Sequence, residues 1–108
     1  MFDRGEIVLI PYPFTNLSTQ KRRPVLVLTR PDEQGDFTAL PVTSQGYHKQ
    51  STAIMGKLKE GQLPKESWVR TDRIVTLNQS LVIKSFASCS ENFINEVMIR
   101  LCRYLGKE

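Results

Sequence analysis

Three short stretches of the sequence place reactive polar side chains where a predicted strand ends or where a strand face could line a groove. They are Arg23-Pro24, Thr43-Ser44-Gln45 and Arg70-Thr71-Asp72. Proline restricts the backbone of the residue before it, which limits the orientations of Arg23. Residues two apart on a strand point the same way, about 7 Å from each other, so Arg70 and Asp72 are predicted to share one strand face.

An arginine beside a carboxylate joins a phosphate-binding fork to a proton acceptor. The charge of Arg70 would keep Asp72 ionised, and its guanidinium would bind a phosphate. RNA cleavage needs these groups, because the ribose 2′-hydroxyl attacks the adjacent phosphorus once a base removes its proton and positive charge stabilises the phosphorane. No metal is required if arginines supply that charge. On spacing alone, a plain surface ion pair is the more common meaning of this pattern, and both interpretations stay open.

A run of short strands is predicted to carry these residues. Apolar and alternating patterns predict strands at 7–12, 24–29, 37–42, 51–55, 68–77 and 81–86. In 68–77, Trp68, Arg70, Asp72 and Ile74 would fall on one side. Turn residues predict a turn at 32–35 and loops at 14–22 and 57–64. The first loop is long for a hairpin, which indicates a functional loop.

The C-terminal segment has the period of a helix. Ser90 can cap it, and the apolar residues from Phe93 to Leu105 recur on one face until Gly106 ends it. Cys102 on that face is interpreted as a small core residue. We therefore predict a mainly β fold with a C-terminal helix, in the form of a small barrel or curled sheet with the helix packed against it.

Size and charge set the broad class. The chain has 108 residues, 40% of them hydrophobic and 24% charged, which predicts one domain over residues 1–108. A core this small gains stability if a dimer buries more surface. The net charge of +4 suits a polyanionic partner such as nucleic acid, with solvated loop charge as the equally favoured alternative.

Metal, disulfide and membrane features are not expected. Cys89 and Cys102 lie far apart, and His48 is the single histidine, so free thiols and no zinc site are predicted. The sequence has no long apolar run and no export signal at its start, which predicts a cytoplasmic protein. His48 lies in a polar loop with no evident partner and is interpreted as a surface residue. Trp68 and Tyr47 could stack on a base; packing is favoured for Trp68, and Tyr47 stays open.

Short segments along most of the chain, from about Gly5 to Leu105, resemble the MazF/PemK/Kid toxins in the same order. The resemblance is weakest in the middle of the chain. Its segments are Arg4-Gly5-Glu6-Ile7-Val8-Leu9, Arg23-Pro24-Val25-Leu26-Val27-Leu28, Pro41-Val42-Thr43-Ser44, Val69-Arg70-Thr71-Asp72 with Thr76, and Asn95-Glu96-Val97 with Arg100-Leu101.

The resemblance implies a fold, an activity and partners. It implies an SH3-like barrel of the MazF/Kid/CcdB type, a homodimer, a cognate antitoxin and a growth-inhibiting endoribonuclease, or mRNA interferase, that cuts single-stranded RNA at short sequences without a cofactor. Asp72 would be the general base, and Thr43 and Arg23 would hold the phosphate. Arg70 would stabilise charge, because a guanidinium pKa above about 12 makes proton release costly.

One loop departs from the family pattern. Where many members carry a Gly-Ser/His-Glu-Gln stretch, residues 16–22 have neither glutamate nor histidine. Other side chains are expected to contact RNA instead. They are the hydrogen-bonding and charged residues of this loop and of the stretches around Thr43 and Asp72. They are Ser18, Thr19, Gln20, Lys21, Arg22, Ser44, Gln45 and Arg73.

Two other functions fit the same fold class. A non-catalytic toxin similar to CcdB would bind DNA gyrase and would need no Arg-x-Asp pair. The other alternative is a non-catalytic barrel that only binds nucleic acid. Incubation with RNA and with a matched DNA distinguishes the three, because only the ribonuclease cuts RNA alone.

Overall fold

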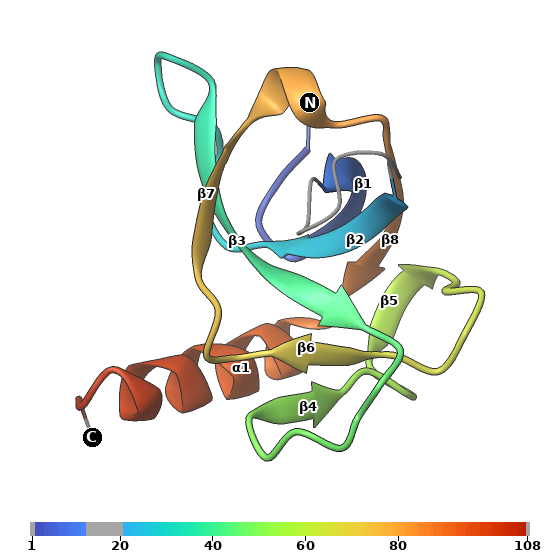
Figure 1. Cartoon of the computed structure of the whole chain (residues 1–108), viewed down its shortest axis with the longest axis vertical. Helices are drawn as coiled ribbons and strands as arrows, with labels where there is room; N and C mark the ends of the chain where they lie inside the picture. Colours follow the sequence, from blue (N-terminus) through green and yellow to red (C-terminus); the bar gives the residue numbers. More distant parts are fainter. Residues whose placement is uncertain (1, 13–20, 108) are drawn as a thin grey trace.

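Short antiparallel strands followed by one helix make up the computed structural model, which describes residues 2–12 and 21–107 (Figure 1). The predicted loop residues Ser18, Thr19 and Gln20 lie outside the described residues. The elements in chain order are β1 (Glu6–Tyr12), β2 (Lys21–Val27), β3 (Asp36–Thr43), β4 (Ser51–Ala53), β5 (Leu58–Gly61), β6 (Trp68–Arg70), β7 (Val75–Asn78), the 3-10 turn η1 (Gln79–Leu81), β8 (Lys84–Cys89) and α1 (Glu91–Tyr104).

The strands form a strongly curled sheet. Their order is β4-β6-β3-β2-β1-β8-β5, and β7 pairs with β3 as well. Strand β3 thus has two partners on one side: its first half, Asp36 to Ala39, pairs with β7, and its last residues, Val42 and Thr43, pair with β6. The result is a half-barrel with α1 lying across one end (Figure 1), which confirms the predicted mainly β class with a C-terminal helix.

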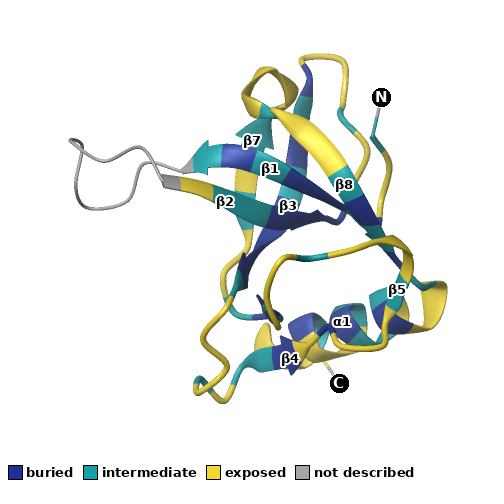
Figure 2. Cartoon of the chain, turned by 90° about the vertical axis from the view of Figure 1, so that its right-hand side faces the viewer, coloured by how far each residue is buried: buried dark blue, intermediate teal, exposed yellow. Residues whose placement is uncertain are grey.

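Apolar side chains are buried on both faces of the central strands, as the continuous apolar run of β2 predicts. Figure 2 shows the dark blue of buried residues along β1 to β3 and on the face of α1 that is turned to the sheet. One core cluster includes Ile7, Leu26 and Val42 with the helix residues Phe93 and Val97. The other lies on the opposite face and is built from Val8, Ile10, Val25, Val27, Phe37 and Ala39.

Helix α1 follows its predicted pattern. The Ser90 hydroxyl accepts a hydrogen bond from the Phe93 N–H at 3.2 Å, which satisfies a backbone donor that the helix itself cannot pair. Phe93, Val97 and Leu101, four residues apart, are the buried ones. Gly106 then adopts a φ of +98°, a conformation that glycine reaches without strain, and ends the helix.

The predicted strand at 68–77 is wrong as a single element. It is broken into β6 and β7 by a turn in which the Arg70 carbonyl accepts from the Arg73 N–H at 3.4 Å. The break lets the two halves pair with different parts of β3. Thr71 is buried at this bend, with 1% of its surface exposed. An alternating sequence pattern contains no signal for such a change of direction.

Three further predictions are corrected. The predicted loop at 57–64 contains β5, which pairs with β8. Strand β2 begins at Lys21, opposite Tyr12, so Arg22 and Arg23 belong to a strand rather than to the loop. The predicted strand at 81–86 begins later, at Lys84. The segments that form β5 and the start of β2 are polar, and their strand conformation comes from pairing with distant strands.

Both thiols are free, and the predicted core position of Cys102 is wrong. Cys102 is only half-buried, whereas Cys89 lies in the core, where burial raises the pKa of its thiol to about 12. No helix in the described part of the chain has the length and apolar character needed to cross a membrane.

The helix cap gives a direct test of this fold. We expect Ser90→Ala to lower the free energy of unfolding by about 1 kcal/mol, because the Phe93 N–H loses its acceptor. Urea unfolding at one protein concentration measures the change. Ser80→Ala, on an exposed part of the 3-10 turn, is the control and should change the midpoint little. Equal midpoints for both variants would show that the cap does not stabilise the chain.

Candidate active site

Arg70 and Asp72 form a two-pronged ion pair. The Arg70 Nε donates to Oδ1 of Asp72 at 2.8 Å, and Nη2 donates to Oδ2 at 2.8 Å. Their side chains are only 17% and 11% exposed. This parallel geometry is the strong form of an arginine–carboxylate contact. The structure thus brings the predicted pair together, through the turn after β6 rather than through a shared strand face.

The pair shifts both pKa values in the direction of charge. Hydrogen bonds from Arg70 lower the pKa of Asp72 most, and the charges of Arg70 and His48 add to this against the effect of burial. The hydrogen bond to Asp72 raises the pKa of Arg70. Asp72 is therefore ionised at neutral pH, and it is a weaker base than an ordinary aspartate.

His48 faces this ion pair from the connection between β3 and β4. Its Nε2 lies 4.0 Å from Oδ2 of Asp72, and its side chain is 38% exposed. The other ring nitrogen, Nδ1, accepts the N–H of Gln50 at 3.1 Å. The interpretation of His48 as a surface residue without a partner is therefore wrong. Its partner lies 24 residues away across a turn that the sequence pattern did not show.

Hydrogen bonds fasten the His48 segment to the turn that carries Asp72. The Gln50 carbonyl accepts from the Thr71 N–H at 2.9 Å and from the Thr71 hydroxyl at 2.8 Å. The next residue, Ser51, pairs with Arg70 across β4 and β6. These hydrogen bonds hold the segment from His48 to Ser51 in a fixed position relative to the Arg70–Asp72 ion pair.

Trp68 supports the same segment. Its indole ring lies so close to Gly46 that a Cβ at this position would overlap the ring. The indole is half-buried and is not part of either core cluster, so of the two packing roles predicted for Trp68, core and dimer contact, the core role is wrong and the dimer contact stays a prediction. Tyr47, between Gly46 and His48, is 84% exposed. Tyr47 and Tyr104 of α1 both lie close enough to Arg70 to raise its pKa slightly, after the larger effect of Asp72.

Thr43 lies on β3, the strand next to β6, and Arg23 lies on β2, the next strand beyond it. Val25 of β2 pairs with Pro41 of β3, and two residues further along these strands are Arg23 and Thr43. Thr43 pairs with Trp68 on its other side, two residues before Arg70. The Thr43 hydroxyl oxygen accepts from the Gln45 N–H at 3.1 Å, which fixes the end of the strand. Three predicted stretches thus meet on adjacent strands, β2, β3 and β6.

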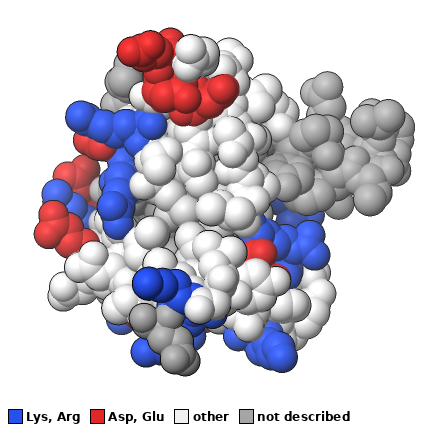
Figure 3. Space-filling view, turned by 90° about the vertical axis from the view of Figure 1, so that its left-hand side faces the viewer, with Lys and Arg blue, Asp and Glu red and all other residues white. Residues whose placement is uncertain are grey.

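The other predicted RNA contacts differ in how they are placed. Arg22, Ser44, Gln45 and Arg73 are exposed. Lys21 begins β2, and its side chain is outside the described set. Figure 3 shows several groups of lysine and arginine side chains on one face, on its lower part and at its upper left, and acidic side chains at its top and left edge. Basic side chains thus predominate on the lower part of this face.

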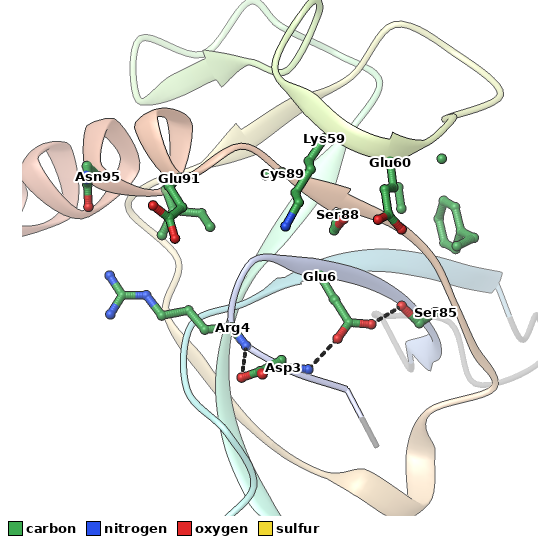
Figure 4. Close-up of a pocket in the computed structure, with 14 residues that line it drawn as sticks. Asp3, Arg4, Glu6, Lys59, Glu60, Ser85, Ser88, Cys89, Glu91 and Asn95 are labelled. Carbon is green, nitrogen blue, oxygen red and sulfur yellow. Dashed lines mark hydrogen bonds between the residues drawn. The ribbon is translucent and has the colours of Figure 1, made fainter.

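A hollow elsewhere on the molecule has a different character (Figure 4). It lies between the N-terminal segment, β5, β8 and the start of α1, and none of Arg70, Asp72 and His48 lines it. Its walls carry more carboxylates than basic side chains, and one of them, Glu6, accepts from the Ser85 hydroxyl at 2.6 Å. An excess of carboxylates repels a phosphate backbone. The hollow does not suit nucleic acid.

The described residues contain no cluster of three potential metal ligands. Within residues 2–12 and 21–107, no group of three His, Cys, Asp or Glu side chains is placed to hold an ion. The arrangement around Asp72 instead combines one carboxylate with a guanidinium and an imidazole. Chemically, it can accept a proton, donate hydrogen bonds and stabilise negative charge.

Solved structures share this fold over nearly their whole length. MazF in a complex with MazE from Deinococcus radiodurans has a TM-score of 0.78 at 24% identity, covering 98% of this chain and 96% of that one. An endoribonuclease in complex with its cognate antitoxin, from a mycobacterial species, has a TM-score of 0.76 at 17% identity, with the same coverage of 98% and 96%. MazF alone from Deinococcus radiodurans is 26% identical, with a TM-score of 0.73 and 96% of each chain covered. No curated protein sequence matches the chain.

The part of the chain that matches a family model contains all the site residues described above. A model of the PemK-like, MazF-like toxins of type II toxin-antitoxin systems matches residues 3–105. This range runs from the segment before β1 to the end of α1, and it confirms the resemblance found in the short sequence segments. The chain therefore belongs to the PemK-like, MazF-like toxin family of type II toxin-antitoxin systems.

Proposed function

We propose that this chain is an endoribonuclease toxin that cuts single-stranded RNA at short sequences without a metal. The family membership supports this, as does the fold shared with a structure named as an endoribonuclease bound to its antitoxin. The observation that carries the proposal is the largely buried, two-pronged Arg70–Asp72 ion pair at the end of β6, the neighbour of β3. An ionised carboxylate held against a guanidinium supplies both a proton acceptor and a phosphate ligand.

The reaction uses the RNA's own nucleophile. Asp72 takes the proton of the 2′-hydroxyl, and the 2′-oxygen forms a bond to the adjacent phosphorus. The bond from phosphorus to the 5′-oxygen then breaks, and this oxygen takes a proton from water. The products are a 2′,3′-cyclic phosphate and a free 5′-hydroxyl. In-line positioning and a base account for much of such an acceleration.

Arg70 stabilises charge in this scheme and does not transfer a proton. Two of its N–H groups are used by Asp72, which leaves the others for the phosphate oxygens. Its raised pKa makes loss of a proton still more costly than for an ordinary guanidinium. Electrostatic stabilisation of the phosphorane is therefore its role.

Thr43 and Arg23 hold the phosphate next to the reacting group. Because the Thr43 oxygen already accepts from Gln45, its hydroxyl hydrogen can be donated to a phosphate oxygen. Arg23 adds positive charge from the neighbouring strand. Exposed basic and amide side chains around them, such as Arg22, Gln45 and Arg73, then follow the backbone of an unpaired strand.

A protein antitoxin is the proposed regulator. Two of the similar structures are complexes of a MazF or an endoribonuclease with its antitoxin. We propose that the antitoxin of this chain lays an acidic or apolar segment over the basic face and blocks RNA. A homodimer and a cytoplasmic location belong to the same proposal.

The direct experiment incubates pure protein with a single-stranded RNA and a matched DNA in the presence of EDTA. We expect cutting of the RNA alone, with cyclic phosphate ends. Binding without cutting would favour a barrel that only binds nucleic acid. Inhibition of gyrase without cutting would favour a toxin similar to CcdB, and either result would overturn the ribonuclease.

Loss of the carboxylate should separate binding from cutting. We expect Asp72→Asn to bind RNA about as well as the unaltered chain and to cut it about 10² to 10⁴ times more slowly, because the proton acceptor is gone. Single-turnover rates and filter binding measure the two effects. Glu33→Gln, in the exposed turn between β2 and β3, is the control. Unchanged turnover in Asp72→Asn would remove Asp72 from the mechanism.

Loss of Arg23 should change the salt dependence of binding. We expect Arg23→Ala to bind RNA more weakly and to reduce the slope of log K against log salt by about 0.7, the contribution of one phosphate contact on a single strand. Arg30→Ala is the matched control, because Arg30 is exposed and pairs with Asp3 at 2.9 Å. An unaltered slope would show that Arg23 does not touch phosphate.

The ion pair should set the acid limit of activity. Because Arg70 lowers the pKa of Asp72, the base form persists below the ordinary aspartate pKa of about 3.9. Arg70→Gln removes this effect, so its cutting rate, though smaller, should begin to fall at a higher pH. Profiles of kcat/KM against pH test this, with circular dichroism as the check on folding. If kcat/KM of Arg70→Gln and of the unaltered chain fell at the same acidic pH, the prediction would be contradicted.

A further inference from the structure

The orientation of the His48 ring leaves one hydrogen-bond donor unused beside Asp72. Since Nδ1 accepts the Gln50 N–H, the hydrogen of the neutral ring lies on Nε2. Nε2 is 4.0 Å from Oδ2 of Asp72, which is too far for a hydrogen bond. Within residues 2–12 and 21–107, this N–H has no acceptor. A donor and an acceptor therefore face each other across a gap.

The distance between the two atoms fits one bridging hydroxyl group that lies beside the line joining them. An oxygen about 2.7 Å from Oδ2 and about 2.9 Å from Nε2 satisfies both distances, with the two bonds at roughly a right angle. A hydroxyl can accept from one side and donate to the other. A phosphate oxygen has no hydrogen to donate and is repelled by the carboxylate.

We propose that His48 and Asp72 together hold the ribose 2′-hydroxyl that attacks the phosphorus. The Nε2–H of His48 donates to the hydroxyl oxygen, and Oδ2 of Asp72 accepts the hydroxyl hydrogen. This inference rests on the proposed ribonuclease function and adds a catalytic residue to it. It also gives the site a means of selecting RNA, because a deoxyribose offers nothing to fill the gap.

The contact helps the reaction because Asp72 is a weak base. Arg70 lowers the pKa of the carboxyl, so proton transfer from a hydroxyl to Asp72 is uphill. A hydrogen bond to the oxygen stabilises the negative charge that forms there as the proton leaves. His48 keeps its own proton throughout, and the proton from the hydroxyl goes to Asp72.

The surroundings of His48 are built to keep the ring in place. The Gln50 carbonyl is held twice by the buried Thr71, and Gly46 lies against the Trp68 ring. A donor held before the reaction needs no reorganisation when charge develops, which is the condition for strong stabilisation of a transition state.

The first test compares two His48 variants on an RNA whose cut site has been mapped. We expect His48→Ala to cut about 10² times more slowly in single turnover, the effect of losing one such donor. His48→Gln is the matched variant, because its amide N–H can reach the position of Nε2, and it should recover much of the rate. Equal, full activity of both variants would overturn the inference.

The second test locates the atom on which His48 acts. An oligonucleotide with a 2′-deoxy nucleotide at the cut site should bind His48→Ala and the unaltered chain equally, because the contacted hydroxyl is absent. Weaker binding by His48→Ala would place His48 on the phosphate instead. An RNA with sulfur in place of the 5′-oxygen needs no protonated leaving group. His48→Ala should stay slow on it, and recovery of its rate would make His48 a proton donor to the leaving oxygen.

Measuring Asp72→Asn together with these variants distinguishes a failure of the His48 role from a failure of the proposed ribonuclease function. If Asp72→Asn is slow and His48→Ala is as fast as the unaltered chain, the role of His48 fails and the ribonuclease proposal stands. If the unaltered chain cuts no RNA, the proposed function itself fails.

Discussion

The attachment of Gln50 to Thr71 is the contact on which the rest of the site depends. Thr71 is buried where the chain turns away from β6, and its N–H and hydroxyl both donate to the Gln50 carbonyl, at 2.9 and 2.8 Å. Arg70 and Asp72 stand on either side of Thr71, and His48 lies two residues before Gln50. One buried polar contact therefore places all three groups relative to one another. Such a contact is costly to break, because the two donors of the buried Thr71 would be left unpaired.

The turn itself follows from the architecture. Strand β3 is long enough to pair with β7 near its start and β6 near its end, so the chain between β6 and β7 has to change direction. Asp72 lies in this change of direction, where its carboxylate reaches back to Arg70. A straight strand would have left the two side chains side by side on an exposed face, with weaker mutual hydrogen bonding. Curling of the sheet thus converts a common surface pattern into a largely buried pair.

Local signals in the sequence determined some features, and distant contacts determined others. The helix was predictable because capping, apolar period and the glycine stop all lie within its own residues. The Arg70–Asp72 pair was predicted from strand alternation, although a turn is what joins the two side chains. Strand β5 and the partner of His48 were missed, since both depend on chain segments far away in sequence.

The position of His48 also bears on how the site differs from its family pattern. Residues 16–22 lack the histidine and glutamate found there in many members, so that loop brings no imidazole or carboxylate to the site. In this chain an imidazole comes from the connection between β3 and β4. Its Nδ1 accepts a backbone N–H, which leaves a ring hydrogen on Nε2, the nitrogen that faces Asp72. A fixed donor suits an oxygen that is gaining negative charge, and it leaves removal of the hydroxyl proton to Asp72.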